Sequence, residues 1–192
     1  MRILILSDRI PPENRGGAGV VTWRLAVALE QAGHDVHVIA ATPDDGFEQV
    51  RQDIPTYHLH SRYPERWRAY FSLRNPMTVP YIRNLYQRLG PDVINAHNIH
   101  TDLSYFALTL ARQQGIPTVF SSHDVMPFAY HKLSYFIDPT RCGVASPAAY
   151  RLPFAYNLRQ MRLRYNPLRN VAIRRILQRD ATLRTAPSYE LA

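Results

Sequence analysis

The sequence has a single cysteine, Cys142, so no disulfide bond can form within the chain. It also has no apolar run close to the roughly 20 residues that a membrane-spanning helix needs. The four apolar residues after Arg2 are too few for a signal peptide, so we expect a cytoplasmic protein. The 192 residues suit one α/β domain, which buries roughly 70% of the surface of its unfolded chain.

Lysine is nearly absent as well, and the formal net charge of +8 comes from arginines that crowd toward the C-terminal end of the chain. This charge predicts an acidic partner, and nucleic acid, an anionic membrane surface or a phosphate-bearing substrate would each satisfy it. A solvated helix face, or a face that covers another domain, explains the same residues. They are Arg151, Arg159, Arg162, Arg164, Arg169, Arg174, Arg175, Arg179 and Arg184.

The N-terminal part of the chain alternates between two apolar patterns. Residues 3–6 and 36–41 are short apolar runs of the kind that fill a parallel strand buried on both faces. Between them, apolar residues recur at helical spacing until Gly33, which supplies a left-handed helix end. The segment therefore predicts a strand, a helix and a second strand. The apolar positions of the helix are Val21, Leu25, Ala28, Leu29 and Ala32.

The turn before this helix carries Gly16, Gly17 and Gly19. Unpaired N–H groups at a helix N-terminus attract anions, and residues without a Cβ let a phosphate approach closely. The spacing departs from the dinucleotide fingerprint G-x-G-x-x-G, and residues 40–42 offer no ribose-binding acid, so a nicotinamide dehydrogenase is disfavoured. An alternative is that the glycines only permit the turn and close helix packing.

Two histidine-bearing loops follow two predicted strands. His97 and Asn98 stand at the carboxyl end of one strand, and His123 and Asp124 lie just past the end of the next. Because the carboxyl ends of parallel strands meet at one edge of a sheet, where ligands bind, these residues are site candidates.

Three interpretations compete at this edge. A metal site has suitable ligand types but no compact spacing such as H-x-x-x-H, so we expect no metal. In the second interpretation each histidine has a structural role and hydrogen-bonds a loop. In the third, neutral imidazole hydrogen-bonds sugar hydroxyls and assists developing charge near neutral pH. The ligand types considered are His97, His100, His123, Asp124 and His131.

Four segments occur in a fixed order along nearly the whole chain. They are the strand MRILILSD with the prolines that follow it, the turn GGAG with the helix that ends in AGHDV, the segment PDVINAH at 91–97, and SSHD at 121–124. In this order they resemble the N-terminal (acceptor-side) domain of a family 4, GT-B type glycosyltransferase.

The resemblance implies an α/β fold, a Rossmann-like open parallel sheet with helices on both faces, over residues 1–187. Residues 188–192 would begin the connection to a C-terminal domain. The implied activity is that of a retaining, metal-independent enzyme, which transfers a sugar from a nucleoside-diphosphate sugar to an acceptor hydroxyl. This domain would mainly bind the acceptor and be inactive alone. The nucleotide-sugar is then a co-substrate, and no cofactor is expected.

The same resemblance implies roles for individual residues. Gly16 and Gly17 would bind the donor diphosphate, and His123 would be a catalytic residue in the cleft between the two domains. The acceptor-side candidates, chosen by their position at the sheet edge, are His97, Asn98 and Asp124.

A different class of function stays open beside the enzyme. The chain could be a stand-alone acceptor-binding or scaffold module that works with a separate donor-binding subunit, its basic C-terminal helices docking on a partner or on the inner face of an anionic membrane. Nucleic-acid binding rests only on charge and on the interleaved arginines and aromatics of residues 61–75. It is disfavoured because the sequence has no nucleic-acid fold signature.

The remaining sequence predicts further elements of the same sheet. Residues 42–52 read as a polar connection, 61–75 as a surface loop or broken helix and a candidate acceptor surface, and 125–150 as an irregular excursion. Strands are expected at 55–60, 92–96, 117–121 and 181–186, and the first of these is expected to be an outer strand. Helices are expected at 79–89, at 103–111 and from about residue 153, with a break at Asn166-Pro167.

Overall fold

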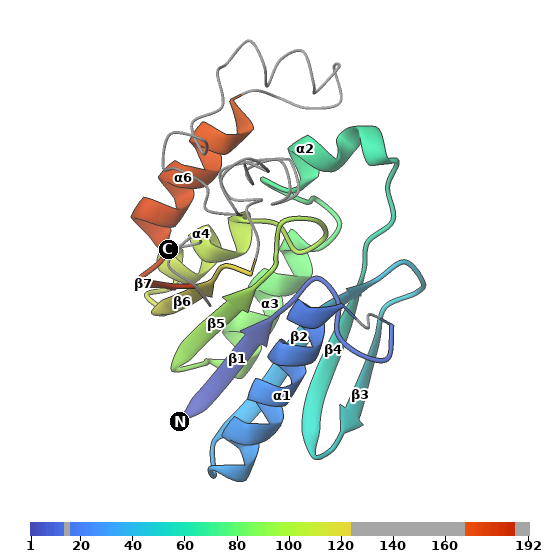
Figure 1. The fold of residues 1–192 in the computed structure, drawn as a ribbon, viewed down its shortest axis with the longest axis vertical. Coiled ribbons are helices and arrows are strands. Elements are labelled where there is room, and N and C mark those ends of the chain that lie inside the picture. Colours follow the sequence, from blue (N-terminus) through green and yellow to red (C-terminus); the bar gives the residue numbers. More distant parts are fainter. Residues whose placement is uncertain (14–15, 124–167, 187–192) are drawn as a thin grey trace, which may run out of the picture.

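The computed structural model describes residues 1–13, 16–123 and 168–186, and its centre is a seven-stranded sheet (Figure 1). The strand order is β3-β4-β2-β1-β5-β6-β7, and every neighbouring pair is parallel except β3 with β4. The expected Rossmann-like sheet is confirmed. The strands are β1 (Arg2–Leu6), β2 (Asp35–Thr42), β3 (Phe47–Arg51), β4 (Ile54–His60), β5 (Val93–His97), β6 (Thr118–Ser121) and β7 (Leu183–Thr185).

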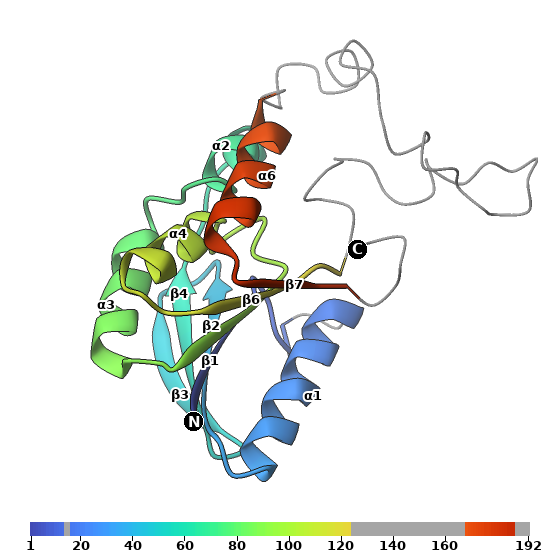
Figure 2. The same ribbon diagram turned by 90° about the vertical axis from the view of Figure 1, so that its left-hand side faces the viewer.

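Helices cover both faces of the sheet, as the sequence predicts (Figure 2). On one face the described helix is α1, and α3, α4 and α6 pack together on the other. The short α2 lies beyond the end of the sheet, near the start of α6. The helices are α1 (Gly17–Gln31), the 3-10 turn η1 (Glu65–Trp67), α2 (Arg68–Phe71), α3 (Val79–Leu89), α4 (Phe106–Gln113) and α6 (Arg169–Asp180).

Two hydrophobic cores follow from the alternation of side chains along the strands. In β1, Ile3 and Ile5 belong to the core that contains Trp23 of α1, whereas Leu4 and Leu6 belong to the core beneath α3, α4 and α6. A strand buried on both faces needs a continuous apolar run, which is the pattern that predicts β1 from the sequence.

Three glycines follow helices in the left-handed region of the backbone. The φ values of Gly33, Gly90 and Gly115 are +83°, +53° and +72°. A glycine adopts these angles without the steric strain that a Cβ would introduce, so it ends a helix at low cost. The helix end predicted at Gly33 is confirmed, and Gly90 directly follows the helix predicted over residues 79–89.

The helix predicted here is α1, but its apolar stripe is confirmed only in part, since Leu29 packs against the core. Val21 is 51% exposed and Ala28 is also exposed, whereas Thr22 and Trp23 are buried. Thr22 can be buried because its hydroxyl donates to the carbonyl oxygen of Ala18 at 2.8 Å. The buried side of α1 thus includes Thr22 and Trp23 as well as Ala26, and apolar spacing alone does not decide which side of this helix is buried.

β3 lies within the segment predicted to be a polar connection, and it displaces β4 from the outer position that the sequence predicts. Phe47 and Val50 are exposed, so antiparallel backbone pairing with β4, and not burial, holds the strand. Gln52 and Asp53 have positive φ values of 49° and 63°, as a two-residue hairpin turn requires. Exposed side chains leave little apolar pattern for the sequence to display.

The C-terminal prediction is confirmed over the part of the chain that the structure describes. α6 lies within the helical stretch expected after residue 153, and β7 lies within the short strand expected over 181–186. The segment 125–150, the break at Asn166-Pro167 and residues 188–192 lie outside the described residues. In the described ranges, no helix combines the length and the apolar character needed to cross a membrane.

Candidate functional site

The connections of the sheet reverse direction between β1 and β5. After β1 the chain passes through α1 on one face to reach β2, and the connections through α3 and α4 use the opposite face to reach β5 and β6. The loops after β1 and β5 therefore diverge at this point, where open α/β sheets bind ligands. The backbone N–H of Asp8 donates to the carbonyl oxygen of Asn98 at 3.1 Å and joins the two loops.

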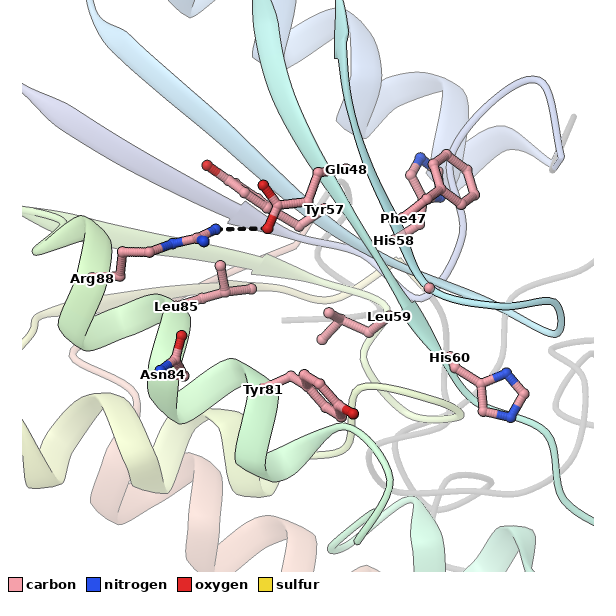
Figure 3. A pocket seen from close by; sticks show the side chains of 11 residues that line it. Phe47, Glu48, Tyr57, His58, Leu59, His60, Tyr81, Asn84, Leu85 and Arg88 are labelled. Carbon is pink, nitrogen blue, oxygen red and sulfur yellow. Dashed lines mark hydrogen bonds and ion pairs between the residues drawn. The ribbon is translucent and has the colours of Figure 1, made fainter.

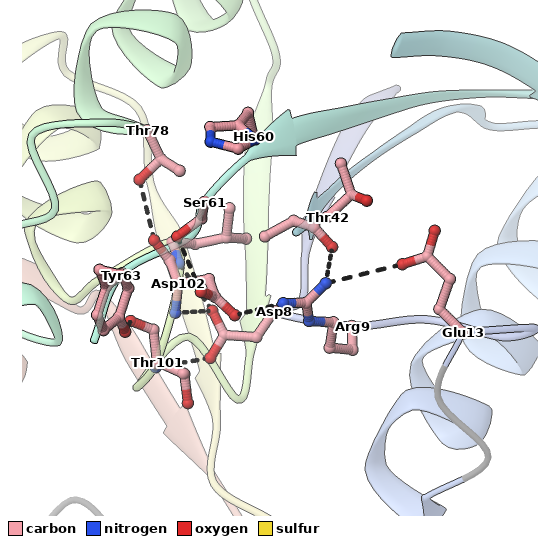
Figure 4. A network of polar contacts seen from close by, with 12 residues as sticks. Asp8, Arg9, Glu13, Thr42, His60, Ser61, Tyr63, Thr78, Thr101 and Asp102 are labelled. Atoms are coloured by element: carbon pink, nitrogen blue, oxygen red, sulfur yellow. Dashed lines mark hydrogen bonds and ion pairs between the residues drawn. The ribbon is translucent and has the colours of Figure 1, made fainter. Parts of the chain in front are cut away.

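Asp8 anchors the loop that follows β5 (Figure 4). Its Oδ1 accepts the N–H groups of Asp102 at 2.9 Å and Leu103 at 2.8 Å, and its Oδ2 accepts that of Thr101 at 2.7 Å. Burial and the nearby charge of Asp102 raise the pKa of Asp8 to about 7, against the three N–H groups that favour its ionised form. We call Asp8 and the loop residues 101–103 the Asp8 clamp.

Asp102 extends the clamp to three more segments. Its Oδ1 accepts the hydroxyl of Ser61 at 2.8 Å, and its Oδ2 lies 3.2 Å from Nη2 of Arg9. Arg9 also donates to the carbonyl oxygen of Ala41 at 2.9 Å and lies 3.9 Å from Glu13. These contacts tie together the ends of β1, β2 and β4 and the loop after β5, so this edge of the sheet is a preorganised polar surface.

His97 and His123 meet at the same edge, and we call them the histidine pair. His97 is the last residue of β5 and pairs in register with Ser121 of β6, two residues before His123. Nδ1 of His97 lies 2.7 Å from Nε2 of His123. His97 is 2% exposed, and burial, assisted by His123, lowers its pKa to about 4. His97 is therefore a neutral imidazole near pH 7.

The start of α1 has open space beside it. Gly16 caps the helix in an extended conformation, with φ −67° and ψ 148°, and Gly17 begins it. Among the residues that the structure describes, a Cβ added to Gly17 would meet no atom within 4 Å. Neither a left-handed backbone nor close helix packing therefore accounts for the glycine at position 17.

Residues 15–188 match the family model of Glycosyltransferase Family 4. The chain belongs to this family. The matched range includes the Asp8 clamp's loop 101–103, the helix start at Gly16 and Gly17, and the histidine pair.

Individual relatives cover smaller parts of the family 4 chain. One subunit of human phosphatidylinositol N-acetylglucosaminyltransferase is 24% identical over 129 residues, which are 66% of this chain and 26% of that protein. A glycosyltransferase of Streptomyces sp. SF2575 superposes with a TM-score of 0.41 and 21% identity over 64% of this chain and 39% of its own. The α,α-trehalose 6-phosphate synthase of Burkholderia multivorans superposes with a TM-score of 0.43 and 12% identity over 96% of this chain and 47% of its own. This chain thus spans about a quarter of the curated relative and less than half of each solved structure.

The structure gathers most of the family 4 site candidates at one edge. The histidine pair and the half-buried Asn98 lie at the carboxyl ends of β5 and β6, and the helix start at Gly16 and Gly17 follows the carboxyl end of β1. Asp124 lies outside the described residues. Among residues 1–13, 16–123 and 168–186, no three histidine, cysteine, aspartate or glutamate side chains are grouped as a metal site would require.

The arginines near the C-terminal end divide into two kinds. Arg169 is buried, and its Nε donates to the hydroxyl of Ser72 at 2.8 Å, which attaches the start of α6 to the end of α2. Arg179 lies 2.6 Å from Asp180. Arg174 and Arg175 are exposed on α6. The net positive charge therefore includes one buried cation that joins two helices, Arg169, as well as a solvated helix face.

A separate groove of about 290 Å³ lies between α3 and the strands β3 and β4 (Figure 3). Leu59 and Leu85 contribute apolar surface, and Arg88 closes one end through its ion pair with Glu48 at 2.8 Å. The groove is two strands removed from β1 and does not include the histidine pair or the Asp8 clamp.

Asp8 and Asp102 are the residues that sequence reasoning missed at this site. Asp8 offers one signal, because it is a charged residue two positions beyond the buried end of β1. Asp102 offers none, since its role depends on contacts with Arg9 and Ser61, which are far away in the sequence.

Proposed function

We propose that this chain is the acceptor-side domain of a retaining glycosyltransferase, which transfers a sugar from a nucleoside-diphosphate sugar to an acceptor hydroxyl. The observation that carries the proposal is the histidine pair, held at the carboxyl edge beside the point where the sheet reverses direction. β6 is two strands from β1, roughly 10 Å at the usual spacing, so His123 and the start of α1 border the same region. Membership of Glycosyltransferase Family 4 supports glycosyl transfer as the reaction class.

In this proposal the start of α1 faces the donor diphosphate. Backbone N–H groups of the first helical turn point out of the helix without intrahelical partners, and they offset negative charge that grows on the leaving diphosphate. The open space at Gly17 lets a phosphate approach the backbone. Residues 1–187 then form one domain, and a second domain holds the nucleotide.

His123 acts on the sugar. As a neutral imidazole it hydrogen-bonds a hydroxyl of the transferred sugar and stabilises charge that develops at the reacting carbon. Asn98, whose carbonyl oxygen accepts the N–H of Asp8, contacts the acceptor in this proposal. In this scheme no step is assigned to a metal ion or a cofactor.

The first test is turnover by the full-length protein with a panel of nucleoside-diphosphate sugars. His123→Ala is expected to lower kcat by about 100- to 10,000-fold while the protein still unfolds cooperatively. His34→Ala, in the turn after α1, is the matched control and should leave kcat unchanged. Wild-type kcat in a folded His123→Ala protein would remove His123 from the mechanism.

The second test addresses the diphosphate. Gly17→Val, and likewise Gly16→Val, places branched carbons in the space proposed for the phosphate, so KM for the donor should rise by about tenfold or more, which corresponds to at least about 1.4 kcal/mol. The fold of Gly17→Val should be unaffected because a Cβ at position 17 meets no atom of the described residues. Ala28→Val, exposed farther along the same helix, is the control. Equal donor KM values in Gly17→Val and Ala28→Val would contradict the assignment of the helix start to the diphosphate.

A second candidate is a stand-alone acceptor-binding module that works with a separate donor-binding subunit. It is favoured by one relative whose name describes a subunit. The intact mass of the native gene product distinguishes the two: about twice the mass of this chain supports a two-domain enzyme, and a product of this mass supports the module.

The surface around α2 supports a peripheral location at the inner face of a membrane. Trp67 and Tyr70 are 45% and 46% exposed, and the guanidinium of Arg66 lies 6.0 Å from the Trp67 ring. Aromatic and arginine side chains together favour the interface of an anionic bilayer. Sedimentation with anionic vesicles, lost with neutral vesicles and in Trp67→Ala, is the expected result.

A further inference from the structure

His97 is enclosed in a way that prevents direct contact with a substrate. It is 2% exposed and lies on a strand paired on both sides, between β1 and β6. Its Nδ1 is occupied by His123 at 2.7 Å. Any effect of His97 on the reaction therefore passes through His123.

The rings of the histidine pair are aligned for a hydrogen bond. They are inclined by 25°, and their centroids are 5.1 Å apart. With nitrogens 2.7 Å apart, this separation places the rings nearly edge to edge in a common plane and not face to face. The N–H and the lone pair of an imidazole lie in the ring plane, so one nitrogen donates directly along the lone pair of the other.

The second nitrogen of His97 indicates which ring donates. Nε2 of His97 is buried and has no hydrogen-bond partner in the described part of the chain. A neutral imidazole carries one N–H, and on Nε2 that N–H would be buried without an acceptor. On Nδ1 it is donated to His123, and only a lone pair is left unpaired. Among buried backbone groups an unpaired N–H is rarer than an under-paired acceptor, and we apply the same preference to the imidazole.

We propose that His97 is a positioning residue whose Nδ1–H is donated to Nε2 of His123, which fixes the ring orientation of His123 and keeps its proton on Nδ1. The pairing of β5 with β6 holds both rings, since His97 is in register with Ser121. The proposal rests on the proposed function in one respect, namely that His123 acts on the substrate.

The tautomer is measured directly, without any assay of activity. In the full-length protein labelled with 15N-histidine, the nitrogen chemical shifts and two-bond couplings of His123 should show a protonated Nδ1 and an unprotonated Nε2. His97→Leu should convert His123 to a mixture of tautomers. His97→Asn, whose amide nitrogen can replace Nδ1, should retain the wild-type pattern. A wild-type His123 protonated on Nε2, or an unchanged pattern in His97→Leu, would overturn the proposal.

Activity then separates positioning from a structural role. His97→Leu should lower kcat by about tenfold with little change in KM, and His97→Asn should recover most of that loss. His58→Leu is the matched control, because His58 is equally buried, also has an unpaired nitrogen and lies on β4, away from the pair. A tautomer shift without a change in kcat would overturn the positioning role. If His123→Ala is fully active while wild-type His123 is protonated on Nδ1, the proposed function fails, but the hydrogen bond from His97 to His123 is still supported.

Discussion

The Asp8 clamp and the histidine pair lie at the same edge of the sheet, yet they differ in how completely their polar atoms are paired. Asp8 accepts three backbone N–H groups, and Asp102 has a donor at each oxygen. The histidine pair shares one hydrogen bond, and Nε2 of His97 has no partner among the described residues. A cluster whose polar atoms are all paired fixes the geometry of a loop, whereas the buried Nε2 of His97 adds no hydrogen bond to the described residues around it.

The largest expected effect is the loss of the clamp. Asp8→Ala leaves three N–H groups without an acceptor, two of them buried and one half-buried, and we expect a loss of about 3–5 kcal/mol in the free energy of unfolding. Urea denaturation checks the value. The control is Asp92→Ala, which removes a carboxylate that accepts one backbone N–H, from Arg2, at an exposed position. Equal losses in the two variants would show that the clamp is no stronger than a surface contact.

The histidine pair should appear in the pH dependence of stability. The pKa of His97 is about 4 in the folded protein and ordinarily 6.5, so only the unfolded chain takes up this proton between those values. The folded state should lose about 3 kcal/mol as the pH falls through this window. The destabilisation caused by His97→Leu should therefore shrink from pH 7 to pH 4.

Protonation of Asp8 changes the stability of the protein in the opposite direction to that of His97. The quantity to measure is therefore the difference in the free energy of unfolding between wild type and His97→Leu. The folded pKa of Asp8, about 7, exceeds the ordinary 3.8, so Asp8 contributes stability that is lost as the pH rises from 4 to 7. His37 and His58, whose pKa values burial lowers, act in the same direction as His97. All three contributions cancel when wild type and His97→Leu are compared at each pH. A constant difference would contradict the depressed pKa of His97.

A smaller effect is expected from the outer part of the clamp. Ser61→Ala removes a buried hydroxyl that donates to Asp102 and accepts from Asn75 at 3.0 Å. We expect a loss of about 1–2 kcal/mol by chemical denaturation, since one buried oxygen and one buried amide lose a partner. A loss as large as that of Asp8→Ala would mean that Asp102, and not Asp8, organises the loop.

The smallest effect is expected from the half-exposed ion pair between Glu13 and Arg9. Glu13 is 3.9 Å from Arg9, with side chains 31% and 27% exposed. Glu13→Gln should change the free energy of unfolding by less than about 0.5 kcal/mol, because solvent screens such pairs. A loss above about 1 kcal/mol in the same denaturation experiment, the upper end for exposed pairs, would extend the clamp to the start of the loop before α1.

Sequence analysis predicted the features that depend on local pattern. The buried runs of β1 and β5 and the left-handed ends at Gly33 and Gly90 are properties of a few adjacent residues, and the structure confirms them. Strand order then placed His97 and His123 at one edge before any distance was known, because consecutive parallel strands share their carboxyl ends.

The remainder depends on contacts between distant parts of the chain. Asp8 is bonded to residues 93 to 95 positions away, and Arg169 to Ser72, so neither could be recognised from its neighbours in sequence. β3 was missed because backbone pairing, and not an apolar face, specifies it. The buried side of α1 was predicted only in part, because Thr22 and Trp23, which the apolar spacing leaves out, are buried while Leu29 packs beside them.

β3 also has a consequence for the behaviour of the protein at high concentration. A sheet with a long, flat, apolar outer strand can recruit the same strand of another molecule and grow into aggregates. Here one boundary is a five-residue antiparallel strand that carries Glu48 and Arg51, and the other is the three-residue β7 with Arg184 at its centre. Short strands that carry charges discourage the addition of further strands, so neither boundary of the described sheet has the long, flat form that favours self-association.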